Sequence, residues 1–191
     1  MNIDKITNFL FEIASMRRLI RSHVQVIPEA NDNISDHSFR VAVIGALLSK
    51  MENCDVYKAL IMCLFHDVAE TRIGDANSTY QRYTTLHEKD ARDDQFSGIP
   101  LGDEILELLN EFDTCKSMEA IVAKDADALD QMILQREYLR KDLENHDQWQ
   151  NYSEKCLKTE SAKKIAQKIR RANPFEWYYE VAKQRNKRLK K

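Results

Sequence analysis

The chain has 191 residues, of which 43% are hydrophobic and 31% are charged, as is typical of one globular domain with a substantial core. Only 4 glycines and 3 prolines are present. A sheet protein needs many such residues for its turns and hairpins, so the composition favours an all-α fold. The net charge of -2 gives no electrostatic reason to expect nucleic acid as the main ligand.

Cysteine usage and the opening residues indicate the cellular compartment in which the protein is expected. The four cysteines are far apart and form no CxxC motif; they are Cys54, Cys63, Cys115 and Cys156. The sequence opens on Met-Asn-Ile-Asp-Lys without an apolar signal segment, and it has no run of about 18 apolar residues. We therefore expect free thiols in a cytoplasmic protein that has no membrane partner.

The first third of the chain predicts two helices. Apolar residues at spacings of three and four predict an amphipathic helix over residues 3–21 that ends in a basic cluster with Arg18 and Arg21. Residues 22–32 are expected to form a loop. Asn33 can cap the next helix, which carries His37 in its first turn. Its buried side is expected to comprise Phe39, Val41, Val43, Ile44, Leu47, Leu48 and Met51.

The middle of the chain predicts a central helix and a polar region. Asp55 can cap a helix that runs to about Arg72 and is apolar nearly all round, so we expect it at the centre of the bundle. Gly74 suits the C-cap of this helix. Residues 77–96 are polar and weakly periodic, which predicts one or two helices near the functional site.

The remaining sequence predicts, in order, a short helix over residues 101–112, a long helix from about 118 to 143, a polar connection, and two final helices. Ser117, Thr159 and Asn173 are the predicted caps. Six of the last nine residues are basic, as expected for a solvated helix end. We expect one domain over residues 1–191, with a core at about 33–143 and C-terminal helices at 153–191 packed on it.

Four residues from three predicted helices have the chemistry of metal ligands. They are His37, the adjacent pair His66 and Asp67, and Asp127, which is flanked by alanines and is costly to bury without a partner. If these helices converge, they supply two imidazoles and two carboxylates. Mixed nitrogen and oxygen ligands suit Mn, Fe, Co, Ni or Zn, whereas an all-oxygen site suggests Mg or Ca.

The order of these residues resembles the signature of the HD-domain metal-dependent phosphohydrolases, a His followed by a His-Asp pair and a later Asp. The local sequence is most similar to the 5'-deoxynucleotidase branch, which includes the HD-domain-containing protein 2 group. The matching segments are residues 34–38, 66–70 with 74–75, and 124–130.

This resemblance implies an all-α HD-domain bundle that hydrolyses nucleoside 5'-monophosphates, preferentially 2'-deoxyribonucleotides, to nucleoside and phosphate. It also implies a homodimer. By position, one divalent metal is expected on His37, His66, Asp67 and Asp127. Arg21 is expected to bind the phosphate, with Arg18 as the alternative. Glu70 and Asp75 match acids that act in catalysis, and Asp75 also matches a residue that contacts the sugar.

Some features leave alternatives open. Arg21 is followed by Ser22 and His23, where the family has an aromatic residue and a glycine, so contacts from this loop to base or sugar are in question. His23, His87 and His146 are possible additional ligands. The alternative functions are a non-catalytic HD module that binds a nucleotide or a partner protein, and a phosphohydrolase with another nucleotide substrate.

Overall fold

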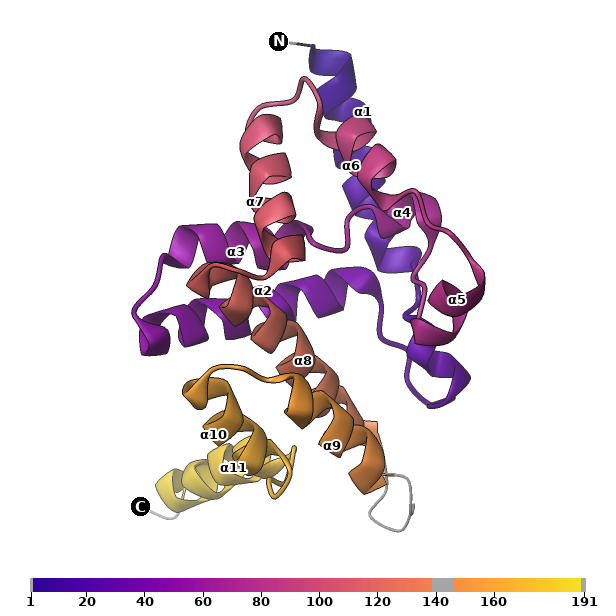
Figure 1. Cartoon of the computed structure of the whole chain (residues 1–191). Helices are drawn as coiled ribbons and strands as arrows, with labels where there is room; N and C mark the ends of the chain where they lie inside the picture. The colour runs from indigo at the N-terminus through magenta and orange to yellow at the C-terminus, as the bar shows by residue number, and fades with distance from the viewer. Residues whose placement is uncertain (1, 139–145, 190–191) are drawn as a thin grey trace.

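The computed structural model describes residues 2–138 and 146–189, in which the regular structure is helical apart from one isolated bridge between Ile20 and Asn33 (Figure 1). The expected all-α fold is confirmed. The α-helices are α1 (Ile3–Ser15), α2 (Ile34–Glu52), α3 (Val56–Phe65), α4 (Glu70–Ile73), α5 (Ser78–Tyr83), α6 (Glu88–Phe96), α7 (Gly102–Thr114), α8 (Met118–Tyr138), α9 (His146–Cys156), α10 (Glu160–Ile169) and α11 (Glu176–Leu189). Two 3-10 turns, η1 (Met16–Arg18) and η2 (Ser22–Gln25), lie between α1 and α2.

Four α-helices begin at predicted caps, namely α2, α3, α8 and α10. The side chain of Asn33 accepts a hydrogen bond from the amide of Asp36 at 3.0 Å. Asp55 and Thr159 cap α3 and α10 in the same way, and Ser117 Oγ accepts from the amide of Ala120 at 3.2 Å. A side-chain oxygen satisfies an N–H group that has no partner within the helix, so these starts are readable from sequence.

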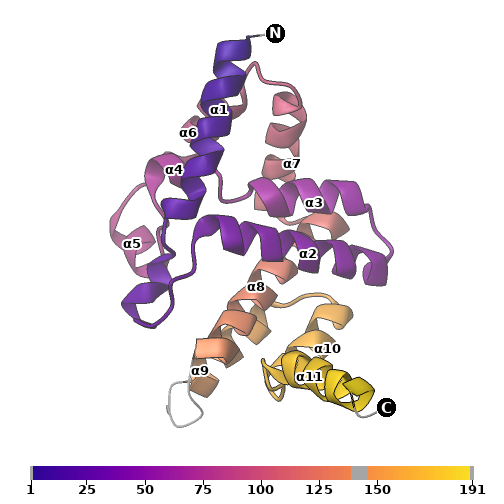
Figure 2. The same ribbon diagram turned by 180° about the vertical axis from the view of Figure 1, so that it is seen from behind.

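The main core lies where α2 and α3 run side by side and α8 crosses them (Figures 1 and 2). The face of α8 in this core is rich in small side chains, and Ala120, Ala123 and Ala126 are completely buried. Small residues let helices approach closely. A second apolar cluster, with Val68, Phe96 and Leu109 at its centre, joins α1, α6 and α7 to the end of α3.

The C-terminal helices attach to α8. Both α9 and α10 pack against it. Asp125, in the middle of α8, accepts hydrogen bonds from the amides of Lys158 and Thr159 at 2.8 and 2.7 Å and from the Thr159 hydroxyl at 2.7 Å. This buried carboxylate therefore holds the N-terminal end of α10.

The first predicted helix is too long. The α-helix ends at Ser15 and is followed by the 3-10 turn η1. The chain then extends, so that the amide of Arg21 donates to the carbonyl of Asp32 at 3.0 Å and the amide of Ile34 donates to the carbonyl of Leu19 at 3.0 Å. These two bonds replace further helical bonds. They join the segment that carries Arg21 to the start of α2.

The predicted buried side of α2 is wrong at four positions. Phe39, Val43, Leu47 and Met51 are 46–67% exposed, while the core-facing side holds small residues such as Ser38, Ala42 and Gly45. The approach is closest at Gly45, where an added Cβ atom would lie 2.5 Å from Cys63 Sγ on α3 and 3.7 Å from Ala126 Cβ on α8. The four exposed residues recur every fourth position and are called the α2 apolar row below.

Two further expectations need correction. Helix α3 is not the central helix of the bundle, since its residues Tyr57 and Leu64 are 48% and 40% exposed. Helix α8 has more buried residues than α3. Residues 146–156 form α9 where a polar connection was expected. Gln150 and Ser153 are among the residues that α9 buries, so hydrophobic periodicity gave little signal. The predicted end of α8 at residue 143 lies outside the described residues.

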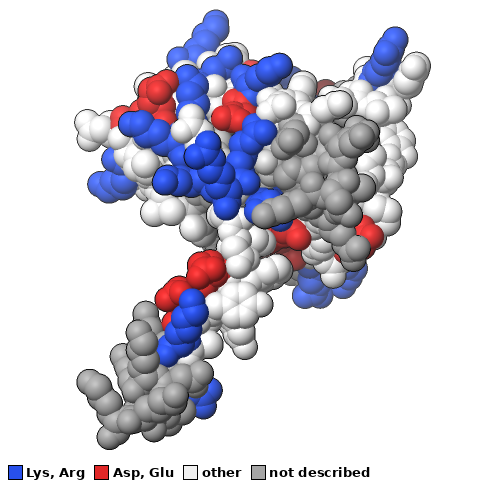
Figure 3. Space-filling view, turned by 90° about the horizontal axis from the view of Figure 1, so that it is seen from below, with Lys and Arg blue, Asp and Glu red and all other residues white. Residues whose placement is uncertain are grey.

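The surface charge is unevenly distributed. Residues 155–191 contain 13 Lys and Arg but only three acidic residues. A view from below shows Lys and Arg side chains gathered on one side of the molecule (Figure 3). Within residues 2–138 and 146–189, no helix combines the length and the hydropathy that a membrane crossing requires.

Candidate metal centre

A tight turn after α3 places His66 and Asp67 together. The prediction that this helix continues to about Arg72 is wrong, because α3 ends at Phe65 and the amides of Val68 and Glu70 bond three residues back at 3.2 and 3.1 Å. In a continuous α-helix, neighbouring side chains point about 100° apart. Here His66 Nε2 lies 3.2 Å from Asp67 Oδ2, so both side chains reach the same point.

His37 and His66 face each other through the same ring nitrogen. Their Nε2 atoms are 3.4 Å apart, and both rings are buried. His66 Nδ1 lies 2.9 Å from the carbonyl of Cys63, and His37 Nδ1 lies 2.7 Å from Asp130 Oδ2. A carbonyl oxygen only accepts, so Nδ1 of His66 carries the proton and Nε2 of the neutral ring keeps its lone pair.

Asp67 and Asp127 complete the cluster. Asp67 Oδ2 and Asp127 Oδ1 lie 3.3 and 3.4 Å from His37 Nε2. Single donor atoms of His37, His66 and Asp127 all fall within 4.8 Å of one another, so these three residues could hold a metal ion. Ligand atoms about 2.1 Å from one shared ion lie roughly 3.0–3.4 Å apart, which fits the spacing of the donors. Asp127 is 37% exposed and opens the cluster to solvent.

The charges in the cluster are strongly coupled. Burial would raise the pKa of Asp67, but His66, His37 and Arg21 outweigh it and hold that pKa well below its usual range. Burial would likewise lower the pKa of His37, yet its hydrogen bonds with Asp130 and Asp67 raise it to about 9. The cluster therefore gathers opposite charges that stabilise one another.

Arg21 lies directly beside these donors. Its Nη1 donates to Asp67 Oδ2 at 2.8 Å, and its Nε is 3.7 Å from Asp75 Oδ2. The same oxygen of Asp75 accepts from the amide of Ser22 at 2.6 Å. The Nε of Arg21 is buried and makes no hydrogen bond with the described residues. Arg18, in contrast, is exposed on η1.

Glu70 is a half-buried acid that the sequence singled out for catalysis. Burial, followed by the charges of Asp67 and Asp75, raises its pKa to about 10, so the side chain holds a proton at neutral pH. Its Oε2 is buried and has no hydrogen-bond partner within the described residues. A protonated carboxyl therefore lies close to Asp67, Asp75 and Arg21 at the edge of the donor cluster.

The structure does not place His23 or His87 in the donor cluster. His23 is half-buried, and burial together with the charge of Arg21 lowers its pKa, but the residues that could share a metal do not include it. His87 is 77% exposed and pairs with Asp90 at 3.2 Å. The side chain of His146 lies outside the described part.

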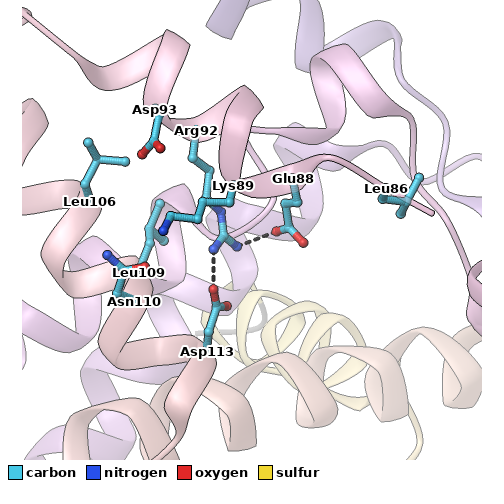
Figure 4. Close-up of a pocket in the computed structure, with 9 residues that line it drawn as sticks. All are labelled: Leu86, Glu88, Lys89, Arg92, Asp93, Leu106, Leu109, Asn110 and Asp113. Atoms are coloured by element: carbon cyan, nitrogen blue, oxygen red, sulfur yellow. Dashed lines mark hydrogen bonds and ion pairs between the residues drawn. The ribbon is translucent and has the colours of Figure 1, made fainter.

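Sequence reasoning missed two buried charges that support the site. Arg92 on α6 is 6% exposed, and its Nη2 donates to the carbonyl of His66 at 3.3 Å. It also bonds Glu88 and Asp113 across a pocket between α6 and α7 (Figure 4). Asp130 is the other buried charge, and it contacts Nδ1 of His37, the ring nitrogen that faces away from the donor cluster. Glu88 four residues before Arg92 was a visible signal for one pair, but nothing local in the sequence links Asp130 to His37.

Comparison with known proteins gives a consistent result. A sequence model described as the HD domain matches residues 13–170. The 5'-deoxynucleotidase HDDC2 of Dictyostelium discoideum is 29% identical over 131 residues, which covers 58% of this chain and 64% of that protein. Its counterpart from Bos taurus is 32% identical over 119 residues and covers 60% of this chain and 57% of that protein. The matches thus span less than two thirds of these relatives.

Solved structures agree with this assignment. A protein from Pyrococcus horikoshii OT3 has a TM-score of 0.70 and 28% identity, and the match covers 89% of this chain and 99% of that one. The fold, the order of His37, His66-Asp67 and Asp127, and the match over residues 13–170 lead to one conclusion. The chain belongs to the HD-domain family.

Proposed function

We propose that this protein is a metal-dependent phosphomonoesterase that hydrolyses nucleoside 5'-monophosphates, with a preference for 2'-deoxyribonucleotides. The observation that carries the proposal is the position of Arg21, whose guanidinium is 2.8 Å from Asp67 at the edge of the donor cluster. A cation beside a metal-capable site suits a phosphate monoester. The relatives named 5'-deoxynucleotidase support the substrate class.

The proposed ligands of one divalent transition metal (Mn, Co, Fe, Ni or Zn) are His37, His66, Asp67 and Asp127. When bound, such an ion supplies Lewis acidity that activates water and offsets phosphate charge. Both histidines turn Nε2 toward the acids. In the neutral form that a metal ligand requires, two imidazoles with two carboxylates suit this group of metals.

The surrounding side chains have separate proposed roles. Arg21 binds and orients the phosphate, because its guanidinium is fixed by Asp67 and Asp75. Glu70 gives or takes a proton at its buried Oε2. Asp75 holds Arg21 and the backbone of Ser22 in place, and we assign it the contact to the sugar.

An assay of phosphate release tests the proposal. The chelated protein is supplied with Mn, Co, Ni, Zn or Mg and then with dAMP, dGMP, dTMP and the matching ribonucleotides. We expect metal-dependent turnover that is faster with the deoxyribonucleotides. Turnover of a dinucleotide or a 3'-phosphate in preference would indicate another nucleotide substrate.

Variants separate catalysis from binding. Glu70→Gln is expected to reduce kcat by about 10²–10⁴-fold, the range for losing a positioned acid or base. Asp90→Asn, a change at a 77% exposed position, is the matched control and should retain wild-type turnover. If no metal supports turnover, or if Glu70→Gln is fully active, the chain is instead a non-catalytic module that binds nucleotide or protein.

The surface and the cysteines support two further proposals, on assembly and on location. We propose a homodimer because the α2 apolar row presents four exposed large side chains on one face, which monomeric proteins seldom leave uncovered. We also propose a cytoplasmic location. All four cysteines are free thiols, as expected in a reducing compartment.

A further inference from the structure

A buried carboxylate outside the proposed ligand set contacts the rear of His37. Asp130 Oδ2 lies 2.7 Å from His37 Nδ1, on the opposite side of the ring from the donor cluster. Both side chains are almost completely buried, with exposures of 2% and 1%. In the neutral ring that binds a metal, a carboxylate that accepts the Nδ1 proton leaves Nε2 as the lone-pair nitrogen, which is the atom that faces Asp67 and Asp127.

A fixed arginine holds this carboxylate in place. Arg40 lies one helical turn after His37 on α2, and its Nε donates to Asp130 Oδ1 at 2.6 Å. Its Nη2 also reaches Asp130 Oδ2 at 3.1 Å. Both oxygens of Asp130 are therefore engaged, and the ionised form is favoured by a permanent positive charge.

The same arginine reaches the segment that carries Arg21. Arg40 forms two hydrogen bonds with Asp32, Nη1 to Oδ1 at 3.0 Å and Nη2 to Oδ2 at 2.6 Å. The carbonyl of Asp32 in turn accepts from the amide of Arg21 at 3.0 Å. One guanidinium thus joins the support of His37 to the backbone that positions Arg21.

We propose that Asp130 is a positioning residue that fixes the tautomer and ring orientation of His37 for metal binding, with Arg40 and Asp32 as its brace. The proposal rests on the metal site described above. Carboxylates that accept the second ring N–H of a ligating histidine typically contribute about 10–100-fold in metal affinity or activity.

Metal affinity of the full-length protein is the first test. Asp130→Asn has nearly the same shape but removes the charge that Arg40 and His37 share. We expect its dissociation constant for Co²⁺, measured by competition with a chelator, to rise about 10–100-fold. Asp130→Glu keeps the charge and should recover part of the loss.

Asp125→Asn is the matched control. Asp125 is equally buried on the same helix, but it bonds the start of α10 and not His37. This variant should lose conformational stability and keep wild-type affinity for Co²⁺. If Asp125→Asn weakens Co²⁺ binding as much as Asp130→Asn, the effect is general destabilisation and the proposal is wrong.

NMR of ¹⁵N-labelled histidine rings reports the tautomer directly. In the Zn²⁺-bound wild type we expect a proton on Nδ1 of His37, with its resonance shifted in Asp130→Asn and shifted less in Arg40→Lys than in Arg40→Gln. An unchanged Nδ1 resonance together with unchanged Co²⁺ affinity would overturn the proposal. These readouts do not involve turnover, so they separate this inference from the proposed nucleotidase function.

Discussion

Arg21 reaches the site only because the chain leaves the helical path after Arg18. Arg21 Nη1 bonds the oxygen of Asp67 that also faces both histidines, whereas Arg18 is exposed three residues earlier. A helical continuation would have kept both arginines near one face. At this position, the extended backbone of three residues decides which cation serves the site.

A pair of arginine variants tests this choice. If Arg21 binds the phosphate as proposed, Arg21→Gln should lower kcat/KM for dAMP by about 10²–10³-fold, because that donor is lost. Steady-state kinetics with the metal-saturated enzyme provide the measurement. Arg18→Gln should be close to wild type, and a larger effect of Arg18→Gln than of Arg21→Gln would assign the phosphate contact to Arg18.

Gly45 is the residue that sets the distance between α2 and α3. A Cβ atom at this position would lie 2.5 Å from Cys63 Sγ and 3.7 Å from Ala126 Cβ. Cys63 is completely buried on α3 and cannot turn to solvent. Absence of a side chain at Gly45 therefore permits the close contact between α2, which carries His37, and α3, which ends just before His66.

We expect Gly45→Ala to lower the free energy of unfolding by about 1–2 kcal/mol, since overpacking outweighs the roughly 1 kcal/mol gain in helix propensity. Urea denaturation measures the change. Adding Cys63→Ala removes the clash, so Gly45→Ala should be neutral or stabilising in that background. Stabilisation by Gly45→Ala alone would contradict the close contact.

At the scale of elements, the starts of four helices were predictable and the ends of two were not. These starts are predicted by local side chains that cap the helix, namely Asn33, Asp55, Ser117 and Thr159. The ends of α1 and α3 depend instead on partners far along the chain, such as the pairing of residues 19–21 with 32–34. Local sequence does not contain those partners, and this limit also hid α9 and the true buried face of α2.

The same distinction applies to the candidate site. The residue types of His37, His66, Asp67 and Asp127 and their order allowed them to be chosen from sequence, and the structure brings them together. The supporting contacts of Asp130 depend on how α2 and α8 cross. Helix crossing follows from packing of the whole core, so such contacts require the structure.

Three elements are joined by Glu12, which bonds Arg72 at 2.6 and 2.9 Å and Gln95 at 2.7 Å. Its hydrogen bond with Arg72 is the main reason that its pKa falls from 4.5 to about 2, and burial opposes the shift. A pKa lowered in the folded state means that the contact stabilises the protein above pH 4.5. That stability is lost as the pH falls toward 2.

Glu12→Gln should therefore be less stable than the wild type by about 1–2 kcal/mol at neutral pH, a modest value because Arg72 is 38% exposed and water screens the pair. Thermal unfolding at several pH values should show this difference shrinking between pH 4.5 and about 2. Glu29→Gln, at an exposed position, is the control. A difference that does not change with pH would contradict the assigned pKa.

For the whole molecule, the α2 apolar row predicts self-association. Leu47→Glu places a charge in the middle of the row, where Leu47 is 61% exposed. Size-exclusion chromatography with light scattering should show a dimer for the wild type and a monomer for this variant. Val26→Glu, at a 64% exposed apolar position outside the row, should remain dimeric. A monomeric wild type, or a dimer that tolerates Leu47→Glu, would remove α2 as the interface.

Asp125 gives the C-terminal segment its own reporter of local opening. The amides of Lys158 and Thr159 are bonded to this one carboxylate, so they exchange hydrogen for deuterium only when α10 separates from α8. Their protection should survive Asp130→Asn and disappear in Asp125→Asn. Two buried aspartates on the same helix would then have separate roles. Asp125 would set how often the C-terminal helices detach from α8, and Asp130 would set the orientation of the His37 ring.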